Sequence, residues 1–363
     1  MKRILVVFGT RPEALKFWPI IKLAKEEYTG KIELKTYVTN QSEEHFIQDI
    51  SADFSAKNIC GTRQASGFGK IYADLEWFLN NRNGWNAVMV QGDTFSTLAG
   101  AQAAYFRGIP LIHIEAGLRT FSRNPWPEEM IRRQVDLMSC WRFSPTVRAH
   151  EKLSLYMLHD HMVGNTIIDR ILLEPESKEP EPDEGNRLTR SAFTSDPKTP
   201  YVLCSLHRRE SWDKFGPMME EMTRVIQKMS STLFVFLSHP NGKLDPFFKF
   251  APGNVQVLPH QEYRSLLRFM RGARAVITDS GGLIEEAAYF RKPCFILRDQ
   301  TERMESVIAK LAKLLGRGKE ISAIPPLMDN LEAWFNPDAP CPYGDGGASG
   351  RILDHLSTCS WSI

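Results

Sequence analysis

The stretch Ile277-Thr278-Asp279-Ser280-Gly281-Gly282-Leu283-Ile284-Glu285-Glu286 reads as one α/β unit: an apolar strand, a tight turn and the start of an amphipathic helix. A helix N-terminus presents unpaired backbone N–H groups and a partial positive charge, so this turn suits a phosphate group. Gly281 and Gly282 allow the backbone to approach an anion, and Ser280 adds a hydroxyl donor. Glu286 follows about one helical turn later, within reach of a sugar hydroxyl. A Gly-Gly turn alone also occurs in ordinary loops, so the assignment depends on the rest of the chain.

Short apolar runs alternate with helix-like segments along the whole chain. Uniformly apolar strands separated by crossover helices predict parallel sheets covered on both faces. In the first half, strands are expected at 4–8, 33–38, 87–90, 110–114 and 142–144, with helices such as 12–27 and 97–107. In the second half, strands are expected at 201–205, 233–237, 255–258, 275–278 and 293–297. The pattern therefore predicts an α/β protein with two Rossmann-like, doubly wound domains that face a cleft.

Residues 174–200 separate the two halves and are rich in Pro, Glu, Asp, Lys and Ser, with little apolar periodicity. This composition is typical of a linker. We expect an N-terminal domain at 1–173 and a second domain at 201–340. Neither half contains a Gly-x-Gly-x-x-Gly fingerprint, which disfavours dinucleotide binding.

The composition excludes several classes of protein. The chain has 363 residues, 42% of them hydrophobic, and a formal net charge of +2, which provides no basic field for nucleic acid. No segment is long and apolar enough to span a membrane, and the apolar run near the N-terminus is too short for a signal peptide. The six cysteines form no Cys-x-x-Cys pair: Cys60, Cys140, Cys204, Cys294, Cys341 and Cys359. A reducing, cytoplasmic compartment is expected, without a disulfide framework or a zinc site.

Polar residues cluster after the expected strands, where ligands of open parallel sheets bind. The segments concerned are 9–13, 91–94, 115–117, 206–210 and 280–282, together with 126–129 in a loop and Arg303 after the last strand. Arg11 and Lys16 are cations suited to phosphate. Together, three carboxylates, a histidine, several cations and a phosphate-type turn favour an enzyme that acts on a phosphorylated sugar.

Each of these residues also has a purely structural interpretation. Asp93 is placed to cap a helix, and Glu128 and Glu129 fit a solvated helix start. His207 fits a hydrogen-bonded core imidazole, and the cations Arg11, Lys16 and Arg303 fit ordinary ion pairs.

Ten motifs resemble one family, in the same order and at similar spacing over nearly the whole chain. In the first half they are Gly9-Thr10-Arg11-Pro12-Glu13, Gln91-Gly92-Asp93-Thr94, His113-Ile114-Glu115-Ala116-Gly117-Leu118-Arg119-Thr120, Pro125-Trp126-Pro127-Glu128-Glu129 and Val163-Gly164-Asn165-Thr166. In the second half they are His207-Arg208-Arg209-Glu210, His239-Pro240-Asn241, residues 278–286, Arg298-Asp299-Gln300-Thr301-Glu302-Arg303 and Pro342-Tyr343-Gly344-Asp345-Gly346. The chain resembles the non-hydrolysing UDP-N-acetylglucosamine 2-epimerases.

The resemblance implies a GT-B-type fold, with the segment 341–363 crossing back to the first domain, and a homodimer. It implies interconversion of UDP-N-acetylglucosamine and UDP-N-acetylmannosamine through elimination of UDP and its readdition to 2-acetamidoglucal, without a metal or another cofactor. The residues that match the family's catalytic groups are Asp93, Glu115, Glu128 and His207. Those that match contacts to the nucleotide, the phosphates or the sugar are Arg11, Lys16, Gln41, Arg132, Ser280, Gly281, Gly282, Glu286 and Arg303.

The sequence departs from the family pattern at positions that flank the matched groups: Ser42, Ile131, Ser211, Ile284 and Met304. These changes keep open a relative that acts on a differently substituted UDP-sugar. Further alternatives are a hydrolysing 2-epimerase that releases the free sugar and UDP, a glycosyltransferase, and a nucleotide-sugar sensor without turnover. Detection of product and of exchange at C2 separates these functions.

Overall fold

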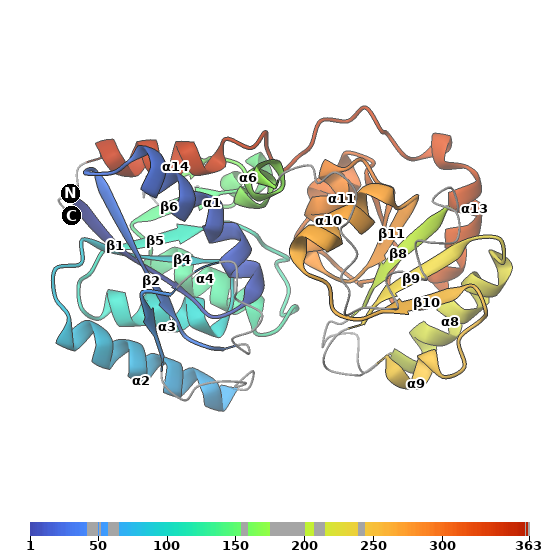
Figure 1. The fold of residues 1–363 in the computed structure, drawn as a ribbon, viewed down its shortest axis with the longest axis horizontal. Coiled ribbons are helices and arrows are strands. Elements are labelled where there is room, and N and C mark those ends of the chain that lie inside the picture. Colours follow the sequence, from blue (N-terminus) through green and yellow to red (C-terminus); the bar gives the residue numbers. More distant parts are fainter. Residues whose placement is uncertain are drawn as a thin grey trace, which may run out of the picture. The chain divides into compact units, whose positions relative to one another are not determined.

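The computed structural model describes residues 1–41, 50, 52–56, 65–153, 159–174, 200–206, 215–238, 244–359 and 361. The chain forms two compact units: unit 1 contains Met1–Leu173 and Tyr343–Ile363, and unit 2 contains Glu174–Pro342. Each unit is a parallel sheet with helices on its faces (Figure 1). The expected linker, 174–200, lies outside the described residues from 175 to 199.

The described strands of unit 1 form one seven-stranded sheet in the order β3-β2-β1-β4-β5-β6-β7. They are β1 (Lys2–Phe8), β2 (Ile32–Val38), β3 (Phe54–Ser55), β4 (Ala87–Gln91), β5 (Leu111–Ile114), β6 (Trp141–Ser144) and β7 (His159–Met162). Neighbouring strands are parallel. The chain order reverses between β1 and β4, so the loops that follow these two strands diverge, and ligands of doubly wound sheets bind at such a point.

Helices cover both faces of this sheet. They are α1 (Arg11–Glu27), α2 (Ala65–Asn81), α3 (Phe95–Tyr105), α4 (Glu128–Met138), α5 (Val147–Glu151), α6 (Thr166–Leu173) and α14 (Ala348–Thr358). Successive side chains of a strand point to opposite faces. Accordingly, Ile4 and Val6 of β1 belong to a core cluster with residues of α1 and α14, and Leu5 and Val7 belong to one with residues of α2 and α3.

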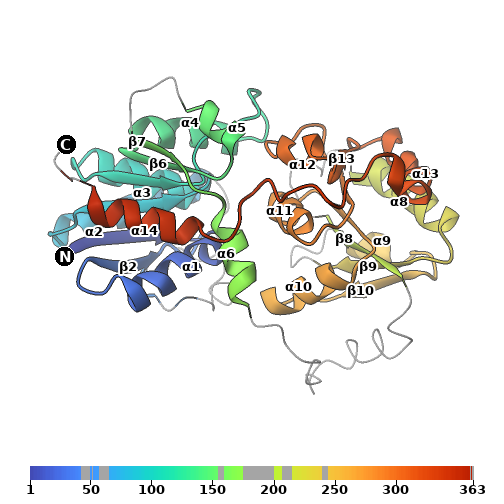
Figure 2. The same ribbon diagram turned by 90° about the horizontal axis from the view of Figure 1, so that it is seen from above.

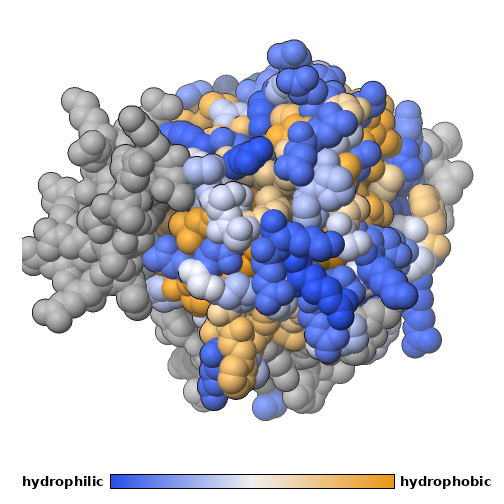
Figure 3. Space-filling view, turned by 90° about the vertical axis from the view of Figure 1, so that its right-hand side faces the viewer, coloured by the Kyte–Doolittle hydropathy of each residue, from blue (hydrophilic) through white to orange (hydrophobic). Residues whose placement is uncertain are grey.

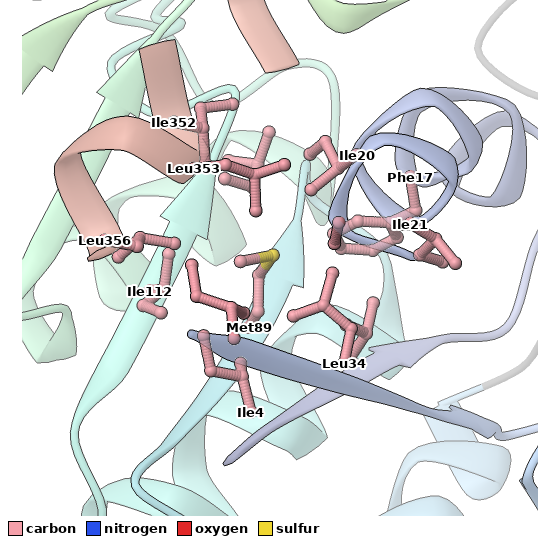
Figure 4. Close-up of a cluster of buried hydrophobic side chains, with 14 of the residues drawn as sticks. Ile4, Phe17, Ile20, Ile21, Leu34, Met89, Ile112, Ile352, Leu353 and Leu356 are labelled. Atoms are coloured by element: carbon pink, nitrogen blue, oxygen red, sulfur yellow. The ribbon is translucent and has the colours of Figure 1, made fainter. Parts of the chain in front are cut away.

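The C-terminal helix α14 completes the core of unit 1. It packs against α1 and α6, two helices that are distant from it in the sequence (Figure 2). Ile352, Leu353 and Leu356 of α14 face α1 and the sheet, where they meet residues such as Ile20 and Met89 (Figure 4). At the N-terminus of α14, the carboxylate of Asp169 accepts from the backbone N–H groups of residues 348 and 349. The final segment is therefore an integral part of unit 1.

The described strands of unit 2 form a six-stranded parallel sheet in the order β10-β9-β8-β11-β12-β13. They are β8 (Tyr201–Ser205), β9 (Leu233–Leu237), β10 (Val255–Leu258), β11 (Ala275–Thr278), β12 (Cys294–Ile296) and β13 (Ala312–Leu314). The helical elements are α8 (Phe215–Lys228), α9 (Asp245–Phe248), α10 (Tyr263–Gly272), α11 (Gly281–Tyr289), α12 (Met304–Ile308), η3 (Lys319–Ala323), α13 (Ile324–Asp329) and η4 (Leu331–Ala333). Here the order reverses between β8 and β11.

The expected α/β fold is confirmed, and each expected strand corresponds to an observed one within two residues. The structure adds β3, β7 and β13, which the sequence did not indicate. β7 has the sequence His-Asp-His-Met and lies at the edge of its sheet, so it has no apolar run to reveal it.

The molecular surface is mixed in polarity. On the face shown in Figure 3, hydrophobic residues form small patches between hydrophilic ones. Within the described part of the chain, no helix combines the length and the hydropathy needed to cross a membrane.

Candidate active site

Glu115 lies at the centre of the polar residues at the C-terminal edge of the unit 1 sheet. It follows β5, is 8% exposed and has a left-handed backbone with φ of 68°. Such a conformation is costly for a residue with a side chain and is often found at functional sites. Lys16 of α1 forms an ion pair with one carboxylate oxygen, and the amide of Gln91, the last residue of β4, donates to the other. Glu115 therefore accepts from donors on two different elements.

Asp93 lies in the next turn of the same edge. The Arg132 side chain of α4 contacts Asp93 Oδ2 through Nε at 2.8 Å and Nη2 at 2.6 Å. Gly92, just before Asp93, has φ of +73°, and a Cβ atom placed on it would lie 3.5 Å from Glu115 Oε2. The turn that carries Asp93 thus lies directly against the Glu115 carboxylate.

Glu128 is the first residue of α4, one helical turn before Arg132, so the two side chains share a face of that helix. Its side chain is partly exposed, whereas Glu129 is fully buried. Glu129 accepts from the backbone N–H groups of Thr120 and Phe121 at 2.9 and 3.3 Å, which ties the preceding loop to the helix. The solvated interpretation of the helix start therefore does not hold for Glu129.

Glu13 connects the loops after β1 and β4. One carboxylate oxygen accepts from Thr10 N–H at 2.8 Å and from Gly9 N–H at 3.1 Å, and the other accepts from the Thr94 and Thr97 hydroxyls at 2.7 and 3.0 Å. Burial raises the pKa of Glu13 above its ordinary value, and these hydrogen bonds oppose the rise. Because Arg11 follows Thr10 and Asp93 precedes Thr94, this network fixes the separation of two candidate loops.

Gln41 joins the same edge from the loop after β2. Its side-chain oxygen accepts from the backbone N–H and the hydroxyl of Ser96, both at 2.8 Å. Ser96 Oγ also lies 2.6 Å from Thr39 Oγ1. The carbonyl end of Gln41 thus fastens the loop after β2 to the start of α3. Arg11, partly buried, is the first residue of α1 and lies beside these loops.

In unit 2, the expected phosphate turn lies at the reversal point of the sheet. Thr278, the last residue of β11, pairs with Ser205 of β8, and its hydroxyl accepts from Ser280 N–H at 3.0 Å. Ser280 is the N-cap of α11 and makes no side-chain capping bond, and α11 begins at Gly281. The helix N-terminus is therefore presented at the edge where ligands of this type of sheet bind.

Arg303 lies against this turn. A Cβ atom placed on Gly281 would lie 2.6 Å from Arg303 Nη1. Arg303 Nε donates to Glu285 at 2.7 Å, and its Nη1 pairs with Glu302. Burying charges in this way is stable only when they are paired. Gly282 and Glu286 follow on the same helix, and Glu286 is buried.

Some expected residues lie outside the described part of the chain. His207 is one of them, although β8 and Leu206 lead directly to it. Ser42 and Ser211 are also outside it. Of the remaining departures from the family pattern, Ile131 and Ile284 lie in the hydrophobic clusters of units 1 and 2. These two replacements therefore contribute to packing.

The structure adds residues to the site that the sequence did not single out: Gln91, Glu13, His113 and Asp136. Gln91 is a polar residue at the end of an apolar strand, and this position could have indicated a site residue from the sequence alone. His113 and Asp136, both buried, form a pair with 2.6 Å between Nδ1 and Oδ1. The sequence feature that could have indicated this pair is a histidine within a short, otherwise apolar strand, because a buried imidazole needs a hydrogen-bond partner.

Comparison with known proteins identifies the family. Residues 32–357 match the family model described as UDP-N-acetylglucosamine 2-epimerase. A relative of that name from Escherichia coli (strain K12) is 33% identical over 385 residues, which cover 98% of each chain. A UDP-GlcNAc 2-epimerase from Neisseria meningitidis, solved with UDP-GlcNAc, has a TM-score of 0.85 at 30% identity and covers 98% of this chain and 99% of its own.

A third similar protein, S. aureus MnaA solved with UDP, has a TM-score of 0.86 at 28% identity, and the match covers 98% of this chain and 96% of that one. The resemblance noted in the sequence is confirmed by these comparisons. Because the family model matches most of its length, the chain belongs to the UDP-N-acetylglucosamine 2-epimerase family of isomerases.

Proposed function

We propose that this protein epimerises UDP-N-acetylglucosamine at C2 to give UDP-N-acetylmannosamine, without hydrolysing the substrate. The observation that carries this proposal is the gathering of Asp93, Glu115 and Glu128 at one edge of the unit 1 sheet, with Arg132 and Lys16 as their cationic partners. Family membership and the relative solved with UDP-GlcNAc support the choice of substrate.

The proposed reaction has two stages. In the first, a carboxylate removes the C2 proton while the bond between C1 and the UDP oxygen breaks, which yields 2-acetamidoglucal and UDP. In the second, UDP adds back to C1 and a carboxylic acid returns a proton to the opposite face of C2. Two faces of one carbon require more than one acid/base group, and a single side chain cannot reach both.

The positions of the carboxylates support separate roles. Both carboxylate oxygens of Glu115 accept hydrogen bonds, one from Lys16 and one from Gln91. These donors stabilise the carboxylate form, which is the form that can remove a proton from the substrate. Asp93 is held by Arg132, and Glu128 extends from the start of α4. We assign proton transfer at C2 to these three residues and stabilisation of the departing diphosphate to His207.

The remaining assignments concern binding. In unit 1 they are Arg11, Lys16, Gln41 and Arg132, and in unit 2 they are Ser280, Gly281, Gly282, Glu286 and Arg303. The helix N-terminus at Ser280, whose side chain makes no capping bond, supports a phosphate contact in unit 2. Lys16 contacts Glu115, and Gln41 contacts the backbone of Ser96. Their proposed role therefore includes holding Glu115 and the loop at Ser96 in place for the substrate.

A second candidate is 2-epimerisation of a differently substituted UDP-sugar, and a third is a hydrolysing 2-epimerase. The altered residues beside the matched motifs favour the differently substituted UDP-sugar. The acid/base residues match the non-hydrolysing pattern, which disfavours the hydrolysing 2-epimerase.

The test is incubation with UDP-GlcNAc in deuterated water, followed by NMR at C2. We expect UDP-ManNAc that carries deuterium at C2, because the abstracted proton is held on exchangeable carboxyl groups. UDP-ManNAc without deuterium rejects the proposed mechanism. Free N-acetylmannosamine with UDP identifies a hydrolase, and the absence of any product from UDP-GlcNAc identifies another UDP-sugar as substrate.

We further propose a homodimer that acts in the cytoplasm. Among the described residues, Cys140, Cys204, Cys294 and Cys359 are free thiols, which supports a reducing compartment. Size-exclusion chromatography with light scattering measures the assembly, and a mass equal to one 41.4 kDa chain rejects the dimer.

A further inference from the structure

His113 and Asp136 form a buried pair beneath the candidate carboxylates. His113 of β5 is 0% exposed and Asp136 of α4 is 1% exposed. His113 Nδ1 lies 2.6 Å from Asp136 Oδ1, and Nε2 lies 2.9 Å from the carbonyl oxygen of Gly92. Neither residue is among the groups assigned to the reaction.

The partners of His113 fix the orientation of its ring. A backbone carbonyl only accepts hydrogen bonds, so Nε2 is the nitrogen that donates to Gly92 O. Burial acts to raise the pKa of Asp136, but His113 and Arg119 hold it below the ordinary value, so Asp136 is a carboxylate. The ring of His113 is therefore held at Nε2 by a backbone carbonyl and at Nδ1 by the Asp136 carboxylate.

This pair contacts each segment that bears a candidate carboxylate. Through Gly92 O it holds the turn just before Asp93, and the N–H of Gly92 donates to Ile114 O at 3.1 Å. Asp136 Oδ2 accepts from Gly117 N–H at 3.2 Å, two residues after Glu115. Asp136 itself belongs to α4, the helix that begins at Glu128.

The turns on both sides have little freedom to shift. Gly92 and Gly117 have φ of +73° and +85°, a region that favours glycine. A Cβ atom on Gly117 would lie 2.2 Å from the carbonyl oxygen of Ala149. Asp136 also pairs with Arg119, at the start of the loop that leads to Glu128. The His113–Asp136 pair thus joins three segments that are distant in the sequence.

We propose that the hydrogen-bonded pair of His113 and Asp136 is the positioning element that keeps Asp93, Glu115 and Glu128 in register for proton transfer at C2. This inference rests on the proposed function of those carboxylates. Proton transfer to opposite faces of one carbon depends on placement, and a shift of about 1 Å is enough to cost about 100-fold in rate. A buried pair of hydrogen-bonded polar groups defines one geometry, because each partner must face the other.

The experiment separates the two contacts of His113. In His113→Gln, the amide reaches the position of Nε2 and keeps a donor to Gly92. In His113→Asn, the amide reaches the position of Nδ1 and keeps a donor to Asp136. Asp136→Asn removes the carboxylate. The matched control is Asp160→Asn, which breaks the pair of the buried Arg142 with the partly exposed Asp160 in the same unit, at 2.6 Å, and leaves the carboxylate of Asp136 unchanged.

For each variant we measure kcat and KM for C2 exchange, UDP affinity and the thermal midpoint. We expect kcat to fall about 10- to 100-fold in the three variants of the pair, with UDP affinity within about twofold. Asp160→Asn should lower the thermal midpoint comparably and keep kcat. Folded variants of His113 and Asp136 that lose only stability, as the control does, overturn the proposal.

A second measurement uses the unsubstituted protein and applies even if the variants do not fold. Nitrogen-15 NMR of the His113 ring, assigned through its own backbone, should show a proton on Nε2 that exchanges slowly with solvent, because Gly92 O holds it. A ring without a proton on Nε2, or with one that exchanges as fast as in a free histidine, overturns the proposal. Failure of the proposed function is distinct: full activity of amide variants of the three carboxylates rejects the function and leaves the Nε2 proton of His113 unaffected.

Discussion

Lys16 and Glu115 form an ion pair inside unit 1, between the first helix, α1, and the residue that follows β5. The side chains of Lys16 and Glu115 are 6% and 7% exposed. Removing one partner from such a pair leaves the other charge buried and uncompensated. The role of Lys16 is therefore linked to Glu115 as much as to any phosphate of the substrate.

The first prediction concerns Lys16→Met. We expect kcat for C2 exchange to fall about 10²-fold, because Glu115 loses the cation that holds it, while UDP affinity changes by less than about threefold. Calorimetry with UDP and NMR exchange measure the two quantities. The control is Lys25→Met, an exposed lysine in the last turn of the same helix. A large loss of UDP affinity at unchanged kcat would instead make Lys16 a phosphate ligand.

The second prediction separates the carboxylates by their surroundings. Asp93→Asn, Glu115→Gln and Glu128→Gln should each lower kcat by at least about 10²-fold. The thermal midpoint should fall for Asp93→Asn and Glu115→Gln, since Arg132 and Lys16 lose their charged partners. Turnover and thermal scans on the same samples provide both values. A variant with near-native kcat removes its residue from the acid/base set.

The sequence predicted the strands and the matched motifs more completely than it predicted the contacts among them. Apolar runs identify buried strands because a parallel sheet is covered on both faces. The polar edge strand β7 has no such signal. Motifs placed Lys16 and Glu115 at one sheet edge, but a contact between residues 99 positions apart depends on the packing of α1.

The pair of His113 and Asp136 shows the same limit. The two residues are 23 positions apart, on a strand and a helix. Each alone has an ordinary interpretation, as a core imidazole and as a helix carboxylate. Their partnership follows only from the position of α4 beside β5, which periodicity does not determine.

The third prediction concerns the glycines of the phosphate turn. Gly281→Ala should lower the free energy of unfolding by about 1–3 kcal/mol, because the new Cβ displaces the Arg303 guanidinium, which Glu285 and Glu302 hold in place. Gly282→Ala is the matched control: within the described part of the chain, its Cβ meets no atom within 4 Å. Since alanine favours a helix over glycine, this variant should gain up to about 1 kcal/mol. Urea unfolding compares the two, and equal effects would contradict the predicted clash.

The fourth prediction concerns the histidines that join α14 to the edge of the unit 1 sheet. The rings of His161 and His355 lie 3.7 Å apart between centroids, and both rings contact Phe143. Burial, followed by the charges of His161, His159 and Lys2, lowers the pKa of His355 to about 4. Burial also lowers the pKa of His161; His159 and His150 act in the same direction and Asp160 opposes them.

A histidine whose folded pKa lies below its unfolded pKa binds fewer protons in the folded state, so stability falls as the pH falls. The loss should begin near the unfolded value of about 6.5 and continue down to about 4, where His355 is charged in both states. We therefore expect the thermal midpoint to decrease across this window, and hydrogen exchange of α14 to increase there, because the two imidazolium ions repel each other at the contact between α14 and β7. His355→Gln, which cannot take up the proton, should flatten the dependence, whereas His260→Gln, at an exposed position in unit 2, should leave it as it is. A midpoint that falls equally steeply in His355→Gln and in the unsubstituted protein would assign the acid sensitivity to other groups.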